Sequence, residues 1–489
     1  MRTFTLLLLL VAGAFTSSLS AQDTLVLTLE KALELANQQS PELMSSRRAL
    51  QQSERQMVMN KADLKPNLRL SFTPFSYDRR NAFAEHNSRY NLTESMSSSI
   101  GLSVSQKVKF TGGTLNLSEG INWSDYKNKS TNTFSSDFSN NLSIRYEQPI
   151  FKYNEIKLNS RAQELSLENS KLSYAIQVIQ MEQTITNAFY GVYSSYKSLK
   201  NTEEAYKNQE ETHNLIKNKV ESKLMAEAEL FQQEINLANQ KDALASAIDS
   251  YQGVKDEFKK TLGLPLDMDI MVIPDTSIVP VYVNAELATQ YALQQRMQLR
   301  QRQIGLEQDE LSLIATKAED KFSGNLSFSV GISGNDKKFE QVFQNQNHNE
   351  GFALSLTIPI WDWGIRKNRI RNAEQNLEDT RLTIEEEKKS VEIRIRELCR
   401  NLPRLLNKIE LSQKSIENAE RTYKINQERY TNNAITAMDF KNYQEQLTSA
   451  QQAYTDAIIA YKRQLLEIKI YTLWDFENNH SILPVDLLK

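Results

Sequence analysis

The sequence Gln148-Pro149-Ile150-Phe151 returns 210 positions later in similar form as Ile358-Pro359-Ile360-Trp361. The same offset relates a series of further residues: Lys157 and Lys367, Arg161 and Arg371, Leu167 and Leu377, Glu229-Leu230 and Asp439-Phe440, Leu237 and Leu447. Upstream the offset is 256, as between Ala36 and Ala292, so the first copy holds 46 additional residues between Phe72 and Pro149. A constant offset over so many positions indicates an internal duplication.

Each copy is predicted to contain a first helix, a strand region, a very long helix and a shorter final helix. The expected helices span residues 29–65, 154–219 and 227–262 in the first copy and 285–321, 365–429 and 437–474 in the second. The long segments are rich in Glu, Gln, Lys, Ala and Leu, which is typical of long helices and coiled coils. Pro403 is expected to kink the second long helix. Two short helices of roughly 50–55 Å equal one long helix of about 100 Å, which favours a tall wall of rods.

Between the helices, apolar and polar residues alternate with the period of two that is typical of half-buried strands. In the second copy this pattern covers residues 326–332 and 352–360, and in the first copy residues 68–72, 100–104 and 142–146, with a weaker example at 115–123. Segments of about 9–10 residues are long enough for a tilted strand to cross a bilayer. Ser and Asn on the opposite face favour a wet lumen. From the strands alone, a soluble β-sandwich is the alternative.

The few strands of one chain cannot close a barrel, and lipid does not tolerate an open sheet edge, so several chains are expected to pool their strands. The 46 additional residues include the turn sequence 107–114, and they are expected to form either an extra membrane hairpin or an enlarged outer excursion. Aromatic residues near the strand ends are expected to form interfacial girdles: Phe75, Tyr77, Phe151, Trp361 and Trp363. A basic run follows, Arg366, Lys367, Arg369 and Arg371, which fits either anionic head groups or a solvated helix face.

The first 21 residues are predicted to be a secretory signal peptide, with Arg2, an apolar run from Leu6 to Ala14 and small residues at Ser20 and Ala21. The mature protein is therefore expected to be exported.

The chain has 489 residues and a net charge of −3, which gives no basis for nucleic-acid binding. Its single cysteine excludes an intramolecular disulfide. Its mean hydropathy of −0.54 excludes a bundle of membrane-spanning helices.

The sequence contains no Gly-x-Ser-x-Gly motif and no phosphate-binding loop, so an enzyme is not expected. His86, His213, His348 and His480 lack a second ligand at metal-binding spacing, and we expect neither a metal nor a cofactor. Cys399 lies within the second long helix and is interpreted as an apolar packing residue.

Three features together carry a resemblance to a known family. They are the opening Leu27-Thr-Leu-Glu-Lys-Ala-Leu-Glu-Leu-Ala36 with Ser40-Pro41-Glu42-Leu43, the two Pro-Ile-aromatic junctions, and Arg429-Tyr430 followed by Asp439. With the duplicated layout, they resemble the TolC-like outer-membrane efflux proteins, also called outer membrane factors. The resemblance implies an α+β membrane protein, a homotrimer whose chains share one transmembrane β-barrel. The barrel is continued by a long α-helical coiled-coil tunnel that projects from the outer membrane into the periplasm.

The resemblance also implies a function: a passive exit duct of a tripartite efflux pump or a type I secretion system. The partners are then a periplasmic adaptor (membrane fusion) protein, an inner-membrane pump and outer-membrane lipid. The alternative is a non-conducting periplasmic coiled-coil scaffold or adhesin stalk. The identity of the exported cargo is not predicted, because specificity is expected to lie with the pump.

The expected domains are a signal peptide at 1–21, a first repeat at 22–262, a linker or equatorial segment at 263–284, a second repeat at 285–474 and an equatorial tail at 475–489.

The resemblance assigns a gate to the periplasmic helix turns. Its pore acids fall on Asp439 and, in the first turn, on Glu229, whereas a second acid falls on Asn442, so that this second ring is either missing or replaced by Glu445. Tyr430 matches a tyrosine of the closed-state latch, although the arginine partner falls on Ile435, and Lys223 and Asn433 replace the turn glycines. The expected adaptor-contacting residues are Ser222, Lys223, Leu224, Asn432, Asn433 and Ala434. Three like carboxylates around an axis attract cations and raise the pKa of at least one acid. The alternative is that Asp439 only caps a solvated helix.

Overall fold

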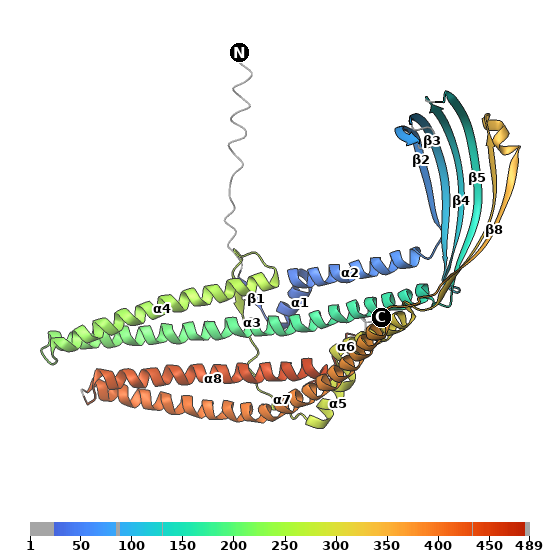
Figure 1. Cartoon of the computed structure of the whole chain (residues 1–489). Helices are drawn as coiled ribbons and strands as arrows, with labels where there is room; N and C mark the ends of the chain where they lie inside the picture. Colours follow the sequence, from blue (N-terminus) through green and yellow to red (C-terminus); the bar gives the residue numbers. More distant parts are fainter. Residues whose placement is uncertain (1–23, 85–88, 130, 433, 485–489) are drawn as a thin grey trace, which may run out of the picture. The chain divides into compact units, whose positions relative to one another are not determined.

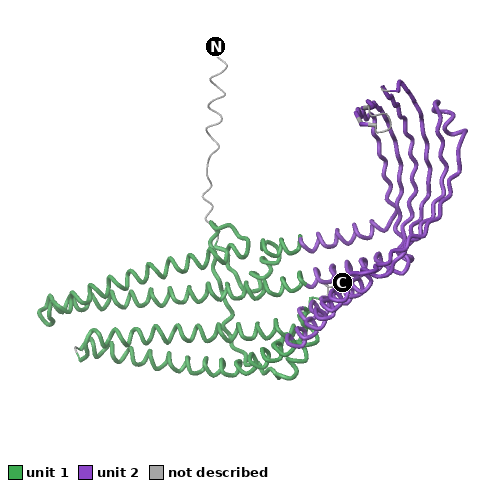
Figure 2. The backbone as a smooth tube through the Cα atoms, in the orientation of Figure 1, with its two compact units in different colours: residues 1–48, 173–297, 388–489 green, residues 49–172, 298–387 purple. Residues whose placement is uncertain are grey.

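The structure is a computed structural model that describes residues 24–84, 89–129, 131–432 and 434–484. Figure 2 shows two compact units. The described parts of residues 1–48, 173–297 and 388–489 form unit 1, and residues 49–172 and 298–387 form unit 2. The predicted signal peptide at 1–21 lies outside the described residues.

Unit 2 contains a six-stranded antiparallel sheet in the order β2-β3-β4-β5-β7-β8 (Figure 1). Its strands are β2 (Asn67–Ala84), β3 (Arg89–Val108), β4 (Gly113–Asn128), β5 (Thr133–Ile150), β7 (Ser323–Asp336) and β8 (Gln346–Thr357), and a short 3-10 helix, η2 (Phe339–Phe343), precedes β8. These strands are longer than the 9–10 residues expected from the alternation, at 12 to 20 residues. The alternation in 352–360 extends past the last strand, because pairing ends at Thr357. The additional residues of the first copy build β3 and β4, and thus add two full strands to the sheet.

Cross-strand register gathers the apolar side chains on one face of this sheet. Leu70 pairs with Leu102, Leu117 with Ile144, and Phe328 with Phe352, and directly paired residues point to the same face. Most of these side chains are exposed in the single chain. The predicted alternation therefore produces an extended apolar surface that no other described element of the unit covers.

The helices of unit 2 belong to four elements: α2 (Pro41–Ala62), α3 (Glu155–Glu221), α6 (Met297–Ala318) and α7 (Ile365–Thr431). Ion pairs connect α6 to both long helices. The Arg300 guanidinium lies 2.7 Å from Glu168 on α3, and Lys317 lies 2.9 Å from Glu374 on α7. Because these side chains are partly exposed, we expect them to align the helices more than to stabilise them.

Unit 1 contains two helical hairpins, α3 with α4 (Glu227–Leu262) and α7 with α8 (Ala437–Thr472) (Figure 1). The shorter elements are β1 (Leu25–Leu27), α1 (Leu29–Gln39), β6 (Ile270–Val272), α5 (Ala285–Gln295), β9 (Trp474–Asp475) and β10 (His480–Ser481). Equivalent helices have equal lengths: α3 and α7 have 67 residues, and α4 and α8 have 36. Helix α7 continues through Pro403. In the part of the chain that the structure describes, no helix combines the length and the apolar character needed to cross a bilayer.

The first helix predicted in each copy was wrong in one respect, because each is two helices. Helix α1 ends before Ser40, whose ψ of 124° is extended, as expected for a residue that precedes a proline. In the second copy, the break between α5 and α6 falls at Arg296, with ψ of 113° and no proline beside it. The guanidinium of Arg296 lies 4.4 Å from the centre of the Tyr471 ring, a tertiary cation–π contact that favours the bent backbone.

Candidate functional site

The turns that join α3 to α4 and α7 to α8 meet around a small apolar core at the ends of the two hairpins. We call this core the tip cluster; its buried members are Ile216, Tyr423, Tyr430, Phe440 and Leu447. Three pairs of residues in or against it lie 210 positions apart: Val220 and Tyr430, Met225 and Ile435, Leu230 and Phe440. Each hairpin thus contributes side chains from the same places of its own turn.

The first turn ends α3 in a Schellman motif. The amide of Leu224 donates to the carbonyl of Lys219 at 2.8 Å, and the amide of Lys223 donates to the carbonyl of Val220 at 2.9 Å. Between these bonds Lys223 takes a left-handed conformation with φ of 59°. Lysine therefore occupies a backbone conformation that glycine adopts with less strain.

Replacing Lys223 with glycine is expected to stabilise the first turn by about 0.5–1 kcal/mol, because relief of left-handed strain exceeds the added chain entropy of glycine. Hydrogen exchange of the Leu224 amide, which closes the motif, measures this change. Lys217→Gly, at an exposed position within α3, is the matched control and should destabilise the helix by about 1 kcal/mol. Equal destabilisation by both variants would contradict the strain argument.

The second turn starts α8 with a capping box. The Thr436 hydroxyl accepts a bond from the Asp439 amide at 3.1 Å, and the Asp439 carboxylate accepts from the Thr436 amide at 3.2 Å and hydroxyl at 2.7 Å. In the first turn, Ala226 stands at the equivalent position and supplies no side-chain cap. The capping role considered for Asp439 is thus present in the single chain, and the predicted pore role does not conflict with it.

These hydrogen bonds hold the pKa of Asp439 below its usual value, with the bond from the Thr436 hydroxyl as the largest cause. A lowered folded-state pKa contributes stability that is present above the unfolded pKa and is lost as pH falls through the folded pKa. In Thr436→Ala the pKa of Asp439 should rise toward the ordinary value, and the start of α8 should lose about 1 kcal/mol. An NMR titration of the Asp439 carboxyl measures the shift; no change in Thr436→Ala would refute the assignment of its cause.

Tyr430 lies in an aromatic stack and not in a polar latch. Its ring is stacked on Phe440 at 4.9 Å and an interplanar angle of 7°, and Phe440 also stacks on Tyr423 at 5.5 Å. The Tyr430 hydroxyl has no hydrogen-bond partner among the described residues. Burial first, and then the negative charge of Glu229, raises the pKa of Tyr430 to about 12. Ile435, at the position where the resemblance placed a latch arginine, packs against the same cluster.

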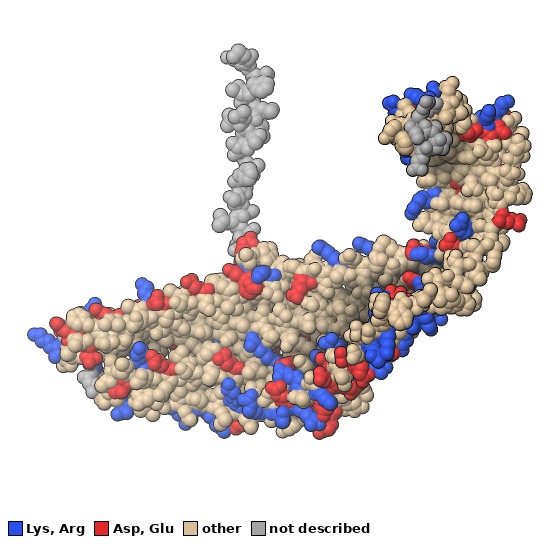
Figure 3. Space-filling view, viewed as in Figure 1, with Lys and Arg blue, Asp and Glu red and all other residues tan. Residues whose placement is uncertain are grey.

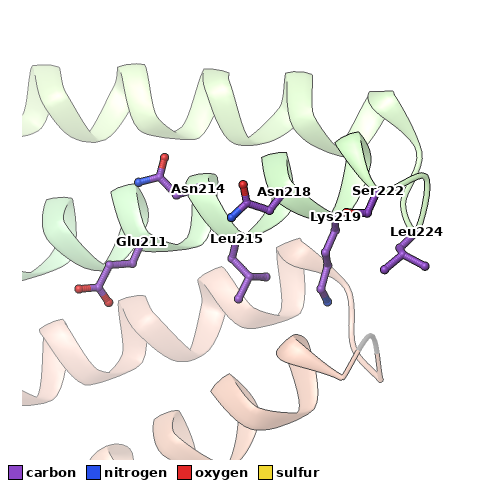
Figure 4. A pocket seen from close by; sticks show the side chains of 7 residues that line it. All are labelled: Glu211, Asn214, Leu215, Asn218, Lys219, Ser222 and Leu224. Atoms are coloured by element: carbon purple, nitrogen blue, oxygen red, sulfur yellow. The ribbon is translucent and has the colours of Figure 1, made fainter.

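A direct bond joins the two hairpins beside this stack. The Lys219 ammonium donates to the carbonyl of Thr431 at 2.7 Å, and thus satisfies a carbonyl at the end of α7. Figure 4 shows Lys219 and Leu215 pointing from α3 toward the second hairpin. They border a shallow hollow of about 520 Å³ whose rim includes Ser222 and Leu224.

The structure brings together only some of the predicted site residues. Tyr430 lies in the tip cluster, close enough to Glu229 that the negative charge of Glu229 helps to raise the pKa of Tyr430. Glu229 and Asn442 are exposed, and Glu445 is exposed and lies 3.6 Å from Lys441. Of the predicted adaptor-contacting residues, Ser222, Lys223, Leu224, Asn432 and Ala434 are exposed turn residues, and Asn433 lies outside the described residues.

Three residues of this site were not predicted. Phe440 is the centre of the aromatic stack, Thr436 forms the capping box, and Lys219 joins the hairpins. Thr436-x-x-Asp439 carries a recognisable capping signature, and the 210-residue offset from Leu230 marks Phe440 as a core position. No local sequence signal indicates the Lys219 bond, because its acceptor is a backbone carbonyl in the other copy.

The described residues contain no group of three or more His, Cys, Asp or Glu side chains that could hold a metal ion. Cys399 is half-buried, and burial raises the pKa of its thiol. A raised pKa disfavours the reactive thiolate, which agrees with a packing role.

The family described as outer membrane efflux protein matches residues 288–474. No curated protein matches the sequence significantly. Among solved structures, the CmeC outer membrane channel of Campylobacter jejuni superposes with a TM-score of 0.68 at 14% identity, over 91% of this chain and 85% of that one. VceC of Vibrio cholerae gives 0.65 at 14% identity over 91% and 95%, and the open MtrE channel of Neisseria gonorrhoeae gives 0.64 at 15% over 91% and 88%. At such low identity these structures show the fold. With the family match, they confirm the predicted resemblance.

Proposed function

Residues 288–474 belong to the outer membrane efflux protein family, and from this premise we propose that the protein is the outer-membrane exit duct of a tripartite efflux pump or a type I secretion system. The matched family consists of channels, not enzymes. In the proposed assembly, three chains combine their sheets into one transmembrane β-barrel, and their helices continue into the periplasm as a tunnel. A periplasmic adaptor joins this tunnel to the inner-membrane pump that drives export.

The observation that carries the proposal is the open six-stranded sheet with one exposed apolar face. Its edges, β2 and β8, lack a second partner strand among the described residues. An open edge is not tolerated in lipid, so a sheet that enters a bilayer must close with strands of other copies. A contiguous apolar surface of this extent is unusual for a soluble monomer and is suited to acyl chains. The equal lengths of equivalent helices support the proposed duplication.

The helix turns are the proposed gate. Glu229 and Asp439 occupy equivalent positions just after the two turns, both exposed in the single chain. Three copies of each would surround a narrow axis with six carboxylates, and Asn442 and Glu445 would follow along α8. The exposed turns around Lys223 and Ala434 would contact the adaptor. The tip cluster and the Lys219 bond then hold the two hairpins of each chain together in the closed state, while the stack of Tyr430 on Phe440 holds α7 against α8.

Planar-bilayer recording of the purified, detergent-extracted protein tests this function. A duct with a closed tip should insert and give a small, stable conductance with cation preference. Protein that is shown to be folded and inserted but is electrically silent would overturn the proposal and support a non-conducting scaffold or stalk. Protein that stays monomeric and soluble without detergent would overturn the membrane assignment itself.

A further inference from the structure

All connections between the sheet and the helices lie at one end of the sheet. Strand pairing ends there at Val108 with Gly113, at Ile150 with Gly324, and at Ser323 with Thr357. The turn 109–112 and the segments 151–154, 319–322 and 358–364 therefore lie at the same end, which we call the helix-side end. The Asn154 side chain connects two of them: its Nδ2 donates to the Lys109 backbone carbonyl at 2.8 Å, and its Oδ1 accepts from the Lys157 backbone amide, at the start of α3, at 3.0 Å.

Large aromatic side chains are exposed at the helix-side end. The exposed fraction is 95% for Phe110, 74% for Trp361 and 86% for Trp363, and Phe151 is also exposed. The two tryptophan rings lie 5.6 Å apart, and the Phe151 ring lies 5.0 Å from that of Phe322. This aromatic band continues the apolar face of the strands directly, since Leu354 and Leu356 precede it in β8. Amphipathic aromatic rings are typical of the level where hydrocarbon meets head groups.

Five cations follow the aromatic band. The exposed side chains of Lys109, Lys157, Lys321, Lys367 and Arg371 form what we call the basic collar. No carboxylate partner is found for any of them among the described residues, so their donors are available to a ligand. The space-filling view shows a largely uncharged sheet wall that gives way to charged side chains beside the helices (Figure 3).

The carboxylates of the same end are already engaged. Glu155 pairs with Lys152 at 3.0 Å and Asp320 with Arg369 at 2.7 Å, Asp63 pairs with Lys107, and Glu319 lies near Arg369. Asp362 accepts from the Gly364 and Arg366 amides, both at 2.9 Å. The uncompensated charge at this end is therefore positive.

We propose that the basic collar and the aromatic band bind the anionic head groups of glycerophospholipids in the membrane leaflet at the helix-side end. From β5 into α3 and from β8 into α7, the order is apolar strand face, aromatic band and basic collar, which matches acyl chain, interface and phosphate. Lys and Arg near an anionic surface each add favourable energy. The inference rests on the proposed function for the presence of a bilayer, and it adds a preference for one class of lipid.

The test uses full-length protein in phosphatidylcholine nanodiscs that contain increasing fractions of brominated phosphatidylglycerol or, separately, brominated phosphatidylcholine. Bromine quenches tryptophan fluorescence, and Trp361 and Trp363 are the reporters, because all proteins compared carry Trp123→Phe and Trp474→Phe, which remove the other two of the four tryptophans. Wild type should be half-quenched at a lower fraction of phosphatidylglycerol than of phosphatidylcholine. The variant Lys109→Gln/Lys367→Gln/Arg371→Gln should reduce this preference on the order of tenfold, and Lys367→Gln alone should reduce it by a smaller factor.

The charge-matched control is Lys389→Gln/Arg404→Gln/Lys408→Gln, which removes two lysines and one arginine from exposed positions of α7 in unit 1. It should keep the wild-type preference. If both lipids quench wild type equally, or if the control loses as much of the preference for phosphatidylglycerol as the triple variant, the proposed lipid binding by the basic collar is wrong. Insertion of wild type into the nanodiscs would still support the proposed channel. Failure of wild type to insert into either nanodisc would instead overturn the proposed function. If the triple variant does not insert, Lys367→Gln decides the outcome.

Discussion

Replacing Phe440 with alanine is expected to loosen the paired helix tips and to raise the conductance of the reconstituted channel several-fold. Phe440 is only 4% exposed and lies between the rings of Tyr430 and Tyr423. Removing a buried phenyl ring costs about 3–5 kcal/mol, because packing is lost and a cavity is left. Tyr430 would lose its stacking partner next to a hydroxyl that already lacks a hydrogen bond. The tip cluster would then favour separated hairpins.

Hydrogen exchange of amides in the two turns measures the loosening, and single-channel recording measures the conductance. The matched control is Phe231→Ala, since Phe231 lies next to the equivalent position in α4 and its side chain is 59% exposed. It should change local stability by less than about 0.5 kcal/mol and leave the conductance unchanged. Faster hydrogen exchange in Phe440→Ala without any change in conductance would show that the tip cluster does not control the gate.

The long helices were predictable from composition, and their interruptions were only partly so. Predicted and observed ends of the two long helices agree to within two residues, because helix formers fill these segments and the turns follow at once. The break at Ser40 had a local signal in Pro41, although the sequence interpretation extended the helix through it. The break at Arg296 had none, since it depends on Tyr471, which is distant in the sequence.

The strand faces were predictable, and the strand lengths were not. Alternation identified which residues share the apolar face, as the pairing of Leu70 with Leu102 confirms. Beyond the alternating segments, β2 and β3 continue through polar residues such as Arg80, paired with Thr93. Backbone hydrogen bonds pair these extensions, and such pairing does not require apolar and polar side chains to alternate. The sequence did not decide whether the additional residues form an extra hairpin or an outer excursion; the antiparallel pairing of β3 with β4 shows that they form a hairpin of the sheet.

At the helix turns, too, the backbone conformation was easier to anticipate than the side-chain contacts. The resemblance places a turn glycine at Lys223, which left the geometry of the first turn open, and Lys223 adopts the left-handed conformation. The aromatic stack joins residues ten positions apart across a turn, and the Lys219 bond joins two copies of the repeat. Neither contact has a periodicity or a motif that sequence alone could reveal.

The proposed carboxylate constriction makes the second large prediction, which concerns ion selectivity. In Glu229→Gln/Asp439→Asn, the ratio of cation to anion permeability should fall several-fold toward unity, because six negative charges leave the narrowest part of the trimer. Asparagine at 439 keeps an oxygen that can accept from the Thr436 amide, so the capping box at the start of α8 is largely preserved. The variant therefore separates the charge of Asp439 from its capping role, which Asp439→Ala would not do.

The control Glu234→Gln removes an exposed carboxylate from α4 farther from the turn and should leave selectivity unchanged. Acid provides an independent check. In a single chain the Thr436 bonds lower the pKa of Asp439, whereas like charges around a trimer axis raise it. If the capping bonds dominate, the contribution of Asp439 to cation preference fades only below the ordinary aspartate pKa of about 3.9; if repulsion dominates, it fades above that value. Selectivity that is insensitive both to acid and to the double variant would place the constriction outside the helix turns.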